Sequence, residues 1–104
     1  MRKQNKLLKE QAEHFGIENR MLQCTEELSE LIQALSKYRR VEQGDKTCML
    51  IKKDVVHMVA EEIADVEICI EQLKHLLCNK EQVERIKKQK IKRTLNAAPF
   101  GSFL

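Results

Sequence analysis

The sequence predicts an all-α protein, and three observations support this prediction. Leu, Ile, Glu, Lys and Gln dominate the composition, whereas the 104 residues include only three Gly and one Pro, which favours helices over strands. Apolar residues recur three or four positions apart over long stretches. A chain of this length builds one modest core and often finishes burying its apolar surface against a copy of itself. We therefore expect a four-helix bundle-like subunit, built on an antiparallel helix hairpin and oligomeric.

The first two helices are expected on either side of Gly16. Residues 2–14 have the pattern of a weakly amphipathic helix that Gly16 can end. From Glu18 to Arg40 the apolar residues follow the helical spacing closely, and Phe15 is expected to be a core residue. Residues 41–51 contain Gly44 and little periodicity, so they are expected to form the connection to the next helix.

The third expected helix, residues 53–78, is the most apolar part of the chain. Of the 23 residues from Val55 to Leu77, 14 are Val, Ile, Leu, Met, Ala or Cys. A helix that faces one neighbour needs apolar residues at about three of every seven positions, so we expect this helix to be buried on more than one side, including against a second subunit. Asn79 is a candidate N-cap, with Gln82 three residues later, for a fourth helix over residues 80–95. One helical domain thus spans residues 1–95, followed by an irregular tail over residues 96–104.

Charge and cysteine usage indicate the setting. The net charge is +3, with acidic residues gathered in the middle of the chain and basic residues near its end. No signal peptide and no membrane-spanning apolar run are found in the sequence, so no membrane association is expected. The four cysteines, Cys24, Cys48, Cys69 and Cys78, include no C-x-x-C pair. They are expected to be small core residues of a reduced, cytoplasmic protein.

Two acidic pairs lie inside the apolar helices. Glu27 and Glu30 are three residues apart, as are Glu62 and Asp65, so each pair shares one face of its helix. Such like-charge pairs cost about a few tenths of a kcal/mol unless a cation lies between them. In a symmetric hairpin centred on Lys46, Glu27 and Asp65 are equally far from the turn, and so are Glu30 and Glu62. The hairpin therefore predicts that the four carboxylates lie at one level.

Four carboxylates at one level of a bundle favour a bound cation. Without one, they would be pushed towards protonation or would open the bundle. An all-oxygen ligand set selects a hard divalent cation, Mg²⁺ or alternatively Mn²⁺, over zinc. Because Mg²⁺ is commonly completed by substrate phosphates, we expect a polyphosphate substrate. For either pair taken alone, a solvated helix face is the alternative interpretation.

The acidic segments Glu26-Glu27-Leu28-Ser29-Glu30 and Glu62-Ile63-Ala64-Asp65 resemble the E-E-x-x-E and E-x-x-D signature of the MazG-like, all-α nucleoside triphosphate pyrophosphohydrolases. The neighbouring Leu31, Ala34, Lys37 and Val66 are also typical of that family, and the resemblance covers residues 15 to about 94. It implies hydrolysis of a nucleoside triphosphate between the α and β phosphates. The products would be the nucleoside monophosphate and pyrophosphate. The biological role implied is housekeeping of the nucleotide pool.

The resemblance also implies a role for each acidic residue. The metal ligands it implies are Glu27, Glu30, Glu62 and Asp65. A metal-bound water of lowered pKa would be the nucleophile. Glu26, which we count among the catalytic residues, or Glu61 would support the ligands or act as the base for this water, and the sequence leaves that choice open.

The fourth expected helix carries a basic run. Residues 80–95 contain seven basic and two acidic residues, a local net charge of +5, and a solvated face is the default interpretation. The alternative is that Lys90 and Arg93, three residues apart, bind the triphosphate together with Lys37. Nucleic-acid binding is not expected, because aromatic residues are scarce and no groove-reading motif is present.

Other functions remain as alternatives to a pyrophosphohydrolase acting as a homodimer or a dimer of dimers. A non-enzymatic interaction protein would use residues 53–78 as a dimer seam and the basic helix for an acidic partner. The three histidines, His14, His57 and His75, and the four cysteines are too scattered for a zinc ligand set. A di-iron carboxylate bundle would want Glu-x-x-His pairs, and neither acidic segment has histidine at that position.

Overall fold

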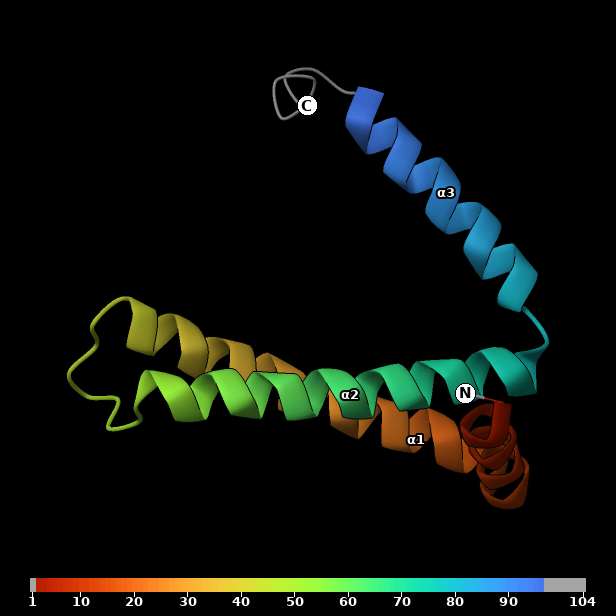
Figure 1. Ribbon diagram of the computed structural model, residues 1–104, viewed down its shortest axis with the longest axis horizontal. Coiled ribbons are helices and arrows are strands. Elements are labelled where there is room, and N and C mark those ends of the chain that lie inside the picture. The colour runs from red at the N-terminus through yellow and green to blue at the C-terminus, as the bar shows by residue number, and fades with distance from the viewer. Residues whose placement is uncertain (1, 97–104) are drawn as a thin grey trace.

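The computed structural model describes residues 2–96, and its regular structure is helical over that range (Figure 1). The elements are α1 (Arg2–Glu42), α2 (Lys52–Leu77) and α3 (Lys80–Asn96). The predicted all-α class is therefore confirmed for the described residues. The expected irregular tail falls on residues 97–104, outside the described part of the chain, except for Asn96, which ends α3.

α1 is broken once, at Gly16. This residue has φ 84° and ψ 167°, a backbone conformation that glycine adopts without the steric penalty a Cβ would bring. The predicted boundary at Gly16 is thus confirmed, as a sharp break inside one long element. The segment before the break meets the end of α2, where the Gln72 side-chain amide donates a hydrogen bond of 3.2 Å to the Leu8 carbonyl oxygen.

The expectation that Phe15 is a core residue is wrong. Its side chain is 50% exposed, because Phe15 is the last residue before the break and its ring lies outside the contact between α1 and α2. The guanidinium carbon of Arg20 lies 4.6 Å from the ring centroid, a cation–π contact. Arg20 also donates a hydrogen bond of 3.1 Å to the side-chain oxygen of the buried Gln72, so this residue joins the two sides of the break to α2.

The part of α1 after Gly16 and the whole of α2 form an antiparallel hairpin (Figure 1). The buried apolar residues of the described chain are small, which lets the two helices approach closely: Ala12, Cys24, Ala34, Val55, Val66 and Cys69. The connection is held by Asp45, which accepts hydrogen bonds from Arg40 and Thr47. The bonds from Thr47 and Arg40 lower the pKa of Asp45 to about 2.

The cysteines are all free, but only two of them lie in the core. Cys24 and Cys69 are buried as expected, Cys48 is half-buried, and Cys78 is exposed. The prediction is therefore wrong for Cys78. This residue ends α2 in the left-handed conformation, with φ 53°, at the place where the chain turns away from the hairpin.

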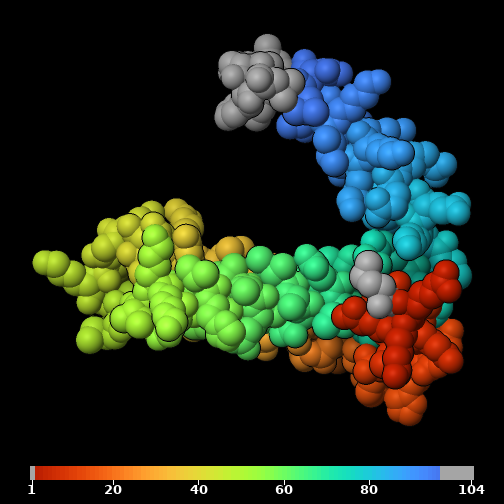
Figure 2. Space-filling model, viewed as in Figure 1, coloured from red at the N-terminus to blue at the C-terminus, as the bar shows by residue number. Residues whose placement is uncertain are grey.

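α3 extends away from the hairpin as a separate arm (Figures 1 and 2). It contacts α2 but not α1, and none of its residues is buried. Asn79 directly precedes it, as predicted, but the Asn79 side-chain oxygen has no hydrogen-bond partner, so the expected side-chain cap is not formed. The joint is instead supported by Lys74, whose amino group lies 2.6 Å from Glu71 and 3.8 Å from Glu84 of α3.

None of the helices within residues 2–96 has an apolar stretch long enough to cross a membrane.

Candidate metal centre

Four carboxylates meet midway along the hairpin, two from α1 and two from α2. One oxygen from each of Glu27, Glu30, Glu62 and Asp65 lies within 4.8 Å of the corresponding oxygens of the other three. We call these residues the carboxylate quartet. The predicted convergence is confirmed, and its cause is simple: the three-residue spacing gives each helix a pair on one face, and the antiparallel packing brings the two faces together.

The quartet has a closed side and an open side. Glu27 and Glu62 are half-buried between the helices, whereas Glu30 and Asp65 are exposed. The buried oxygens Oε2 of Glu27 and Oε2 of Glu62 have no hydrogen-bond partner. A buried carboxylate oxygen without a partner is costly. A divalent cation between the helices would satisfy both atoms at once, so the donor set fits a hard metal ion.

Charge repulsion within the quartet affects Asp65. Burial and the negative charge of Glu27 raise the pKa of its carboxyl group. Two unit charges no more than 4.8 Å apart repel each other by about 1 kcal/mol or more, and by about 3 kcal/mol where water screens them less. The metal-free quartet therefore opposes folding of the hairpin, and a bound cation would reverse the sign of that contribution.

Gln23 orients one of the inner carboxylates, and the sequence analysis missed it. The Gln23 side-chain amide donates a hydrogen bond of 2.8 Å to Oε1 of Glu27, which leaves Oε2 directed at no protein donor. The signal was present in the sequence, because residues four positions apart share a helix face and a Gln–Glu pair can bond there.

The structure does not bring every predicted site residue to the quartet. Glu26 and Glu61 are exposed and adjacent in sequence to quartet residues, and Glu61 is paired with His57 at 2.8 Å. Lys37 is half-buried on α1, two helical turns beyond Glu30. The other predicted basic residues, Lys90 and Arg93, are exposed on α3, which makes no contact with α1.

Two buried thiols lie beside the quartet along the same helix contact. Burial, with a smaller contribution from neighbouring negative charge, raises the pKa of Cys24 and of Cys69. Both sulfurs therefore stay protonated near neutral pH, and a protonated thiol is a poor metal ligand. The ligand atoms offered to an ion are carboxylate oxygens alone.

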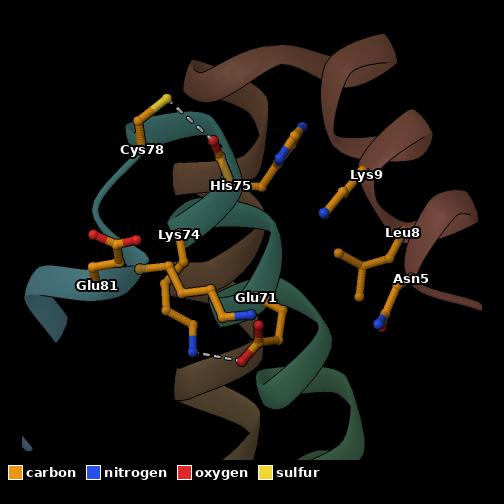
Figure 3. Close-up of a pocket in the computed structure, with 9 residues that line it drawn as sticks. Asn5, Leu8, Lys9, Glu71, Lys74, His75, Cys78 and Glu81 are labelled. Carbon is orange, nitrogen blue, oxygen red and sulfur yellow. Dashed lines mark hydrogen bonds and ion pairs between the residues drawn. The ribbon is translucent and has the colours of Figure 1, made fainter. Parts of the chain in front are cut away.

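A hollow of about 560 Å³ lies where α2 ends and α3 begins (Figure 3). Its walls carry the amino groups of Lys9 and Lys74 and the imidazole of His75. These groups are largely satisfied within the protein, since Lys74 is paired with Glu71 and His75 lies 3.0 Å from Glu13. The quartet residues do not line this hollow, so it is separate from the candidate metal centre.

The chain matches no protein-family model, no curated protein and no solved structure.

Proposed function

We propose that this protein is a Mg²⁺-dependent nucleoside triphosphate pyrophosphohydrolase. The observation that carries the proposal is the carboxylate quartet, in which two buried oxygens lack partners. The quartet coincides with the acidic segments that resemble the MazG-like enzymes, and this resemblance supports the choice of reaction. Mn²⁺ is the alternative ion, because it accepts the same oxygen ligands.

The chain's own residues would divide the work as follows. Glu27, Glu30, Glu62 and Asp65 would hold the ion on the closed side and leave the open side to the triphosphate. Mg²⁺, when bound, supplies charge neutralisation for the phosphates and activation of a water molecule. Since Glu61 is already paired with His57, we assign the base for that water to Glu26.

The function is tested by neutralising the two inner ligands. Glu27→Gln and Glu62→Gln should each reduce Mg²⁺-dependent pyrophosphate release at least about 100-fold, because losing a ligand removes several kcal/mol of charge stabilisation. The measurement is pyrophosphate release from a panel of standard and modified nucleoside triphosphates, which also defines base and sugar preference. Circular dichroism should remain helical for both variants.

Glu67→Gln is the matched control, because it makes the same chemical change on an exposed position of α2 outside the quartet. It should retain wild-type activity. Full activity of both the Glu27 and the Glu62 variants would refute the assignment of the quartet as the catalytic metal centre.

We further propose that the bundle and the oligomer are completed by a second chain. One side of the hairpin carries partly exposed apolar side chains from both helices, which we call the apolar face: Leu28, Leu35, Val56, Ile63 and Ile70. The buried residues of each helix form a stripe along its contact with the other helix. With a rotation of about 100° per residue, the exposed apolar residues of each helix all lie to the same side of that stripe. Because the helices are antiparallel, the two sets lie on one side of the hairpin. A second copy would bury them and complete a four-helix arrangement, as a homodimer or a dimer of dimers.

The rival function is a non-enzymatic interaction protein, and one observation favours it: α3 is strongly basic and has no buried residue. Thermal melting with Mg²⁺ or Mn²⁺ and a non-hydrolysable nucleotide separates the two. A ligand that binds only the folded state must raise the melting temperature. An unchanged melting temperature with both ions would support the rival.

A further inference from the structure

We infer that α3 of one chain crosses the open side of the carboxylate quartet of a second copy, where Lys90 and Arg93 supply positive charge for an anionic substrate. This inference rests on the proposed function and names the partner that completes the same site. The occupant of the open side is thus a segment of an identical chain.

α3 does not lie over its own chain's quartet. It leaves α2 after Cys78 and Asn79 and extends away from the hairpin (Figures 1 and 2). Within residues 2–96 it contacts only α2, and it makes no contact with α1, which provides half of the quartet. Its joint is braced by Lys74, which is 9% exposed and lies between Glu71 and Glu84.

The quartet and α3 carry opposite charge. The quartet contributes four formal negative charges, and Glu26 and Glu61 add two more beside it. Residues 80–95 carry a net charge of +5. The outer carboxylates, Glu30 and Asp65, are exposed, as is α3. Within residues 2–96, α3 makes no contact with α1. Attraction between the quartet and α3 is therefore expected to guide and orient association of two copies.

One side of α3 carries apolar side chains followed by basic ones. Val83, Ile86, Lys90 and Arg93 follow a spacing of three, four and three, so they share one side of the helix. The first part of this side is apolar and the second part is basic. The basic part of this side is the part that we assign to the acidic opening of the partner chain.

A dimer formed through the apolar face would leave the open side of the quartet accessible. Relative to the buried stripe, Ile63 lies on one side of α2 and Asp65 lies on the other, and Leu28 and Glu30 are divided in the same way on α1. The apolar face and the acidic opening are thus on opposite sides of the hairpin. A two-fold assembly that brings one α3 to the other chain's opening makes the same contact a second time by symmetry.

The contact is tested by zero-length cross-linking of the unmodified protein without metal. Equal amounts of ¹⁵N-labelled and unlabelled chains are refolded together and treated with a carbodiimide, which joins an amino group directly to a carboxylate in contact with it. Mass spectrometry of the digest should show mixed-isotope peptide pairs that join Lys90 to Glu30 or Asp65. Lys92 is the matched control, because it lies on the opposite side of α3 and should give no such pair.

Two outcomes would overturn the inference. Links from Lys90 found only within chains of one isotope would mean that α3 folds back onto its own hairpin. Links from Lys92 that are as frequent as those from Lys90, or no links between α3 and the quartet, would mean that α3 is a solvated arm or serves a different acidic partner.

Activity provides an independent test by complementation. A Glu27→Gln chain and a Lys90→Ala/Arg93→Ala chain should each be impaired alone. If α3 acts on the partner's quartet, random pairing restores about a quarter of wild-type pyrophosphate release, since half of the dimers contain one intact site of two. No recovery in a mixture proven to contain heterodimers would contradict action in the partner chain. Failure of the proposed function is distinguishable, because wild-type protein would then release no pyrophosphate while the cross-links still form.

Discussion

Asp65 is a side chain whose negative charge opposes folding while no cation is bound. Its pKa is raised by burial and by the charge of Glu27, so its ionised form is less stable in the folded protein than in the unfolded chain. The folded state therefore binds this proton up to a higher pH than the unfolded state does. Stability of the metal-free protein should fall as pH rises from the ordinary value of about 3.8 through the raised pKa, and the loss persists at neutral pH.

Asp65→Asn should therefore stabilise the metal-free protein at neutral pH while abolishing the response to metal. We expect a small rise in melting temperature, no more than about 4 °C, because the uncharged amide no longer repels Glu27. Millimolar Mg²⁺ should raise the melting temperature of the wild type but not of this variant. Differential scanning calorimetry between pH 4 and pH 8 measures both effects.

Glu67→Gln provides the comparison for that experiment, since Glu67 is exposed on α2 and does not belong to the quartet. It should leave the pH dependence and the Mg²⁺ response unchanged. A lower melting temperature for metal-free Asp65→Asn would contradict the view that the quartet is repulsive without an ion.

Among the elements, α1 is divided by a single residue into two segments that contact α2 at different places. Gly16 turns the chain so that residues 2–15 reach Gln72 near the end of α2 while residues 17–42 pack along α2. No atom lies within 4 Å of the position that a Cβ would occupy at Gly16. The requirement for glycine here is therefore conformational, and space for a side chain is not limiting.

Gly16→Ala should destabilise the protein by about 1 to 2 kcal/mol, the cost of holding an L-residue at positive φ. Urea unfolding followed by circular dichroism measures this loss. Ser29→Ala is the control within α1, because it is exposed, adds helix propensity and should be neutral or slightly stabilising. Equal stability of Gly16→Ala and wild type would show that the break is not required in solution.

The sequence predicted the elements better than their ends and their placement. The periodicity of residues 18–40 and 53–78 defined the hairpin, and Gly16 marked the break, because these signals are local. The absence of a side-chain cap at Asn79 and the exposure of Phe15 depend on how the chain turns between helices, which local spacing does not contain. The quartet was predictable because a symmetric hairpin relates position along the chain to position in space.

At the scale of the whole molecule, a single chain buries few of its apolar side chains. The described residues have only six buried apolar side chains, and of these Val55 is the largest that is fully buried. The strong apolar character of α2 therefore exceeds what α1 alone covers. The composition predicts association between chains, and this stays a prediction. The positions of α2 that α1 leaves uncovered are those that a second chain would contact.

Ile63→Glu should dissociate the oligomer that we propose, because it places a charge in the apolar face. Ile68→Glu is the comparison: Ile63 is 42% exposed and Ile68 is 45% exposed on the same helix. Ile68 follows Asp65 by three residues and lies on the side of the acidic opening, where an added negative charge does not oppose the approach of the basic α3. Sedimentation velocity should show a shift to monomer for Ile63→Glu only. Equal behaviour of the two variants would argue against an interface on the apolar face.

The thiols also determine where oxidation would begin. Oxidants attack thiolates, and attack requires access. Cys24 and Cys69 are buried, and their pKa values are raised. Both the lack of access and the protonated state therefore protect these thiols from oxidation. Cys78 is exposed at the joint between α2 and α3. Mild oxidation should therefore first alter the joint that carries the basic arm, and leave the carboxylates and their neighbouring sulfurs chemically intact.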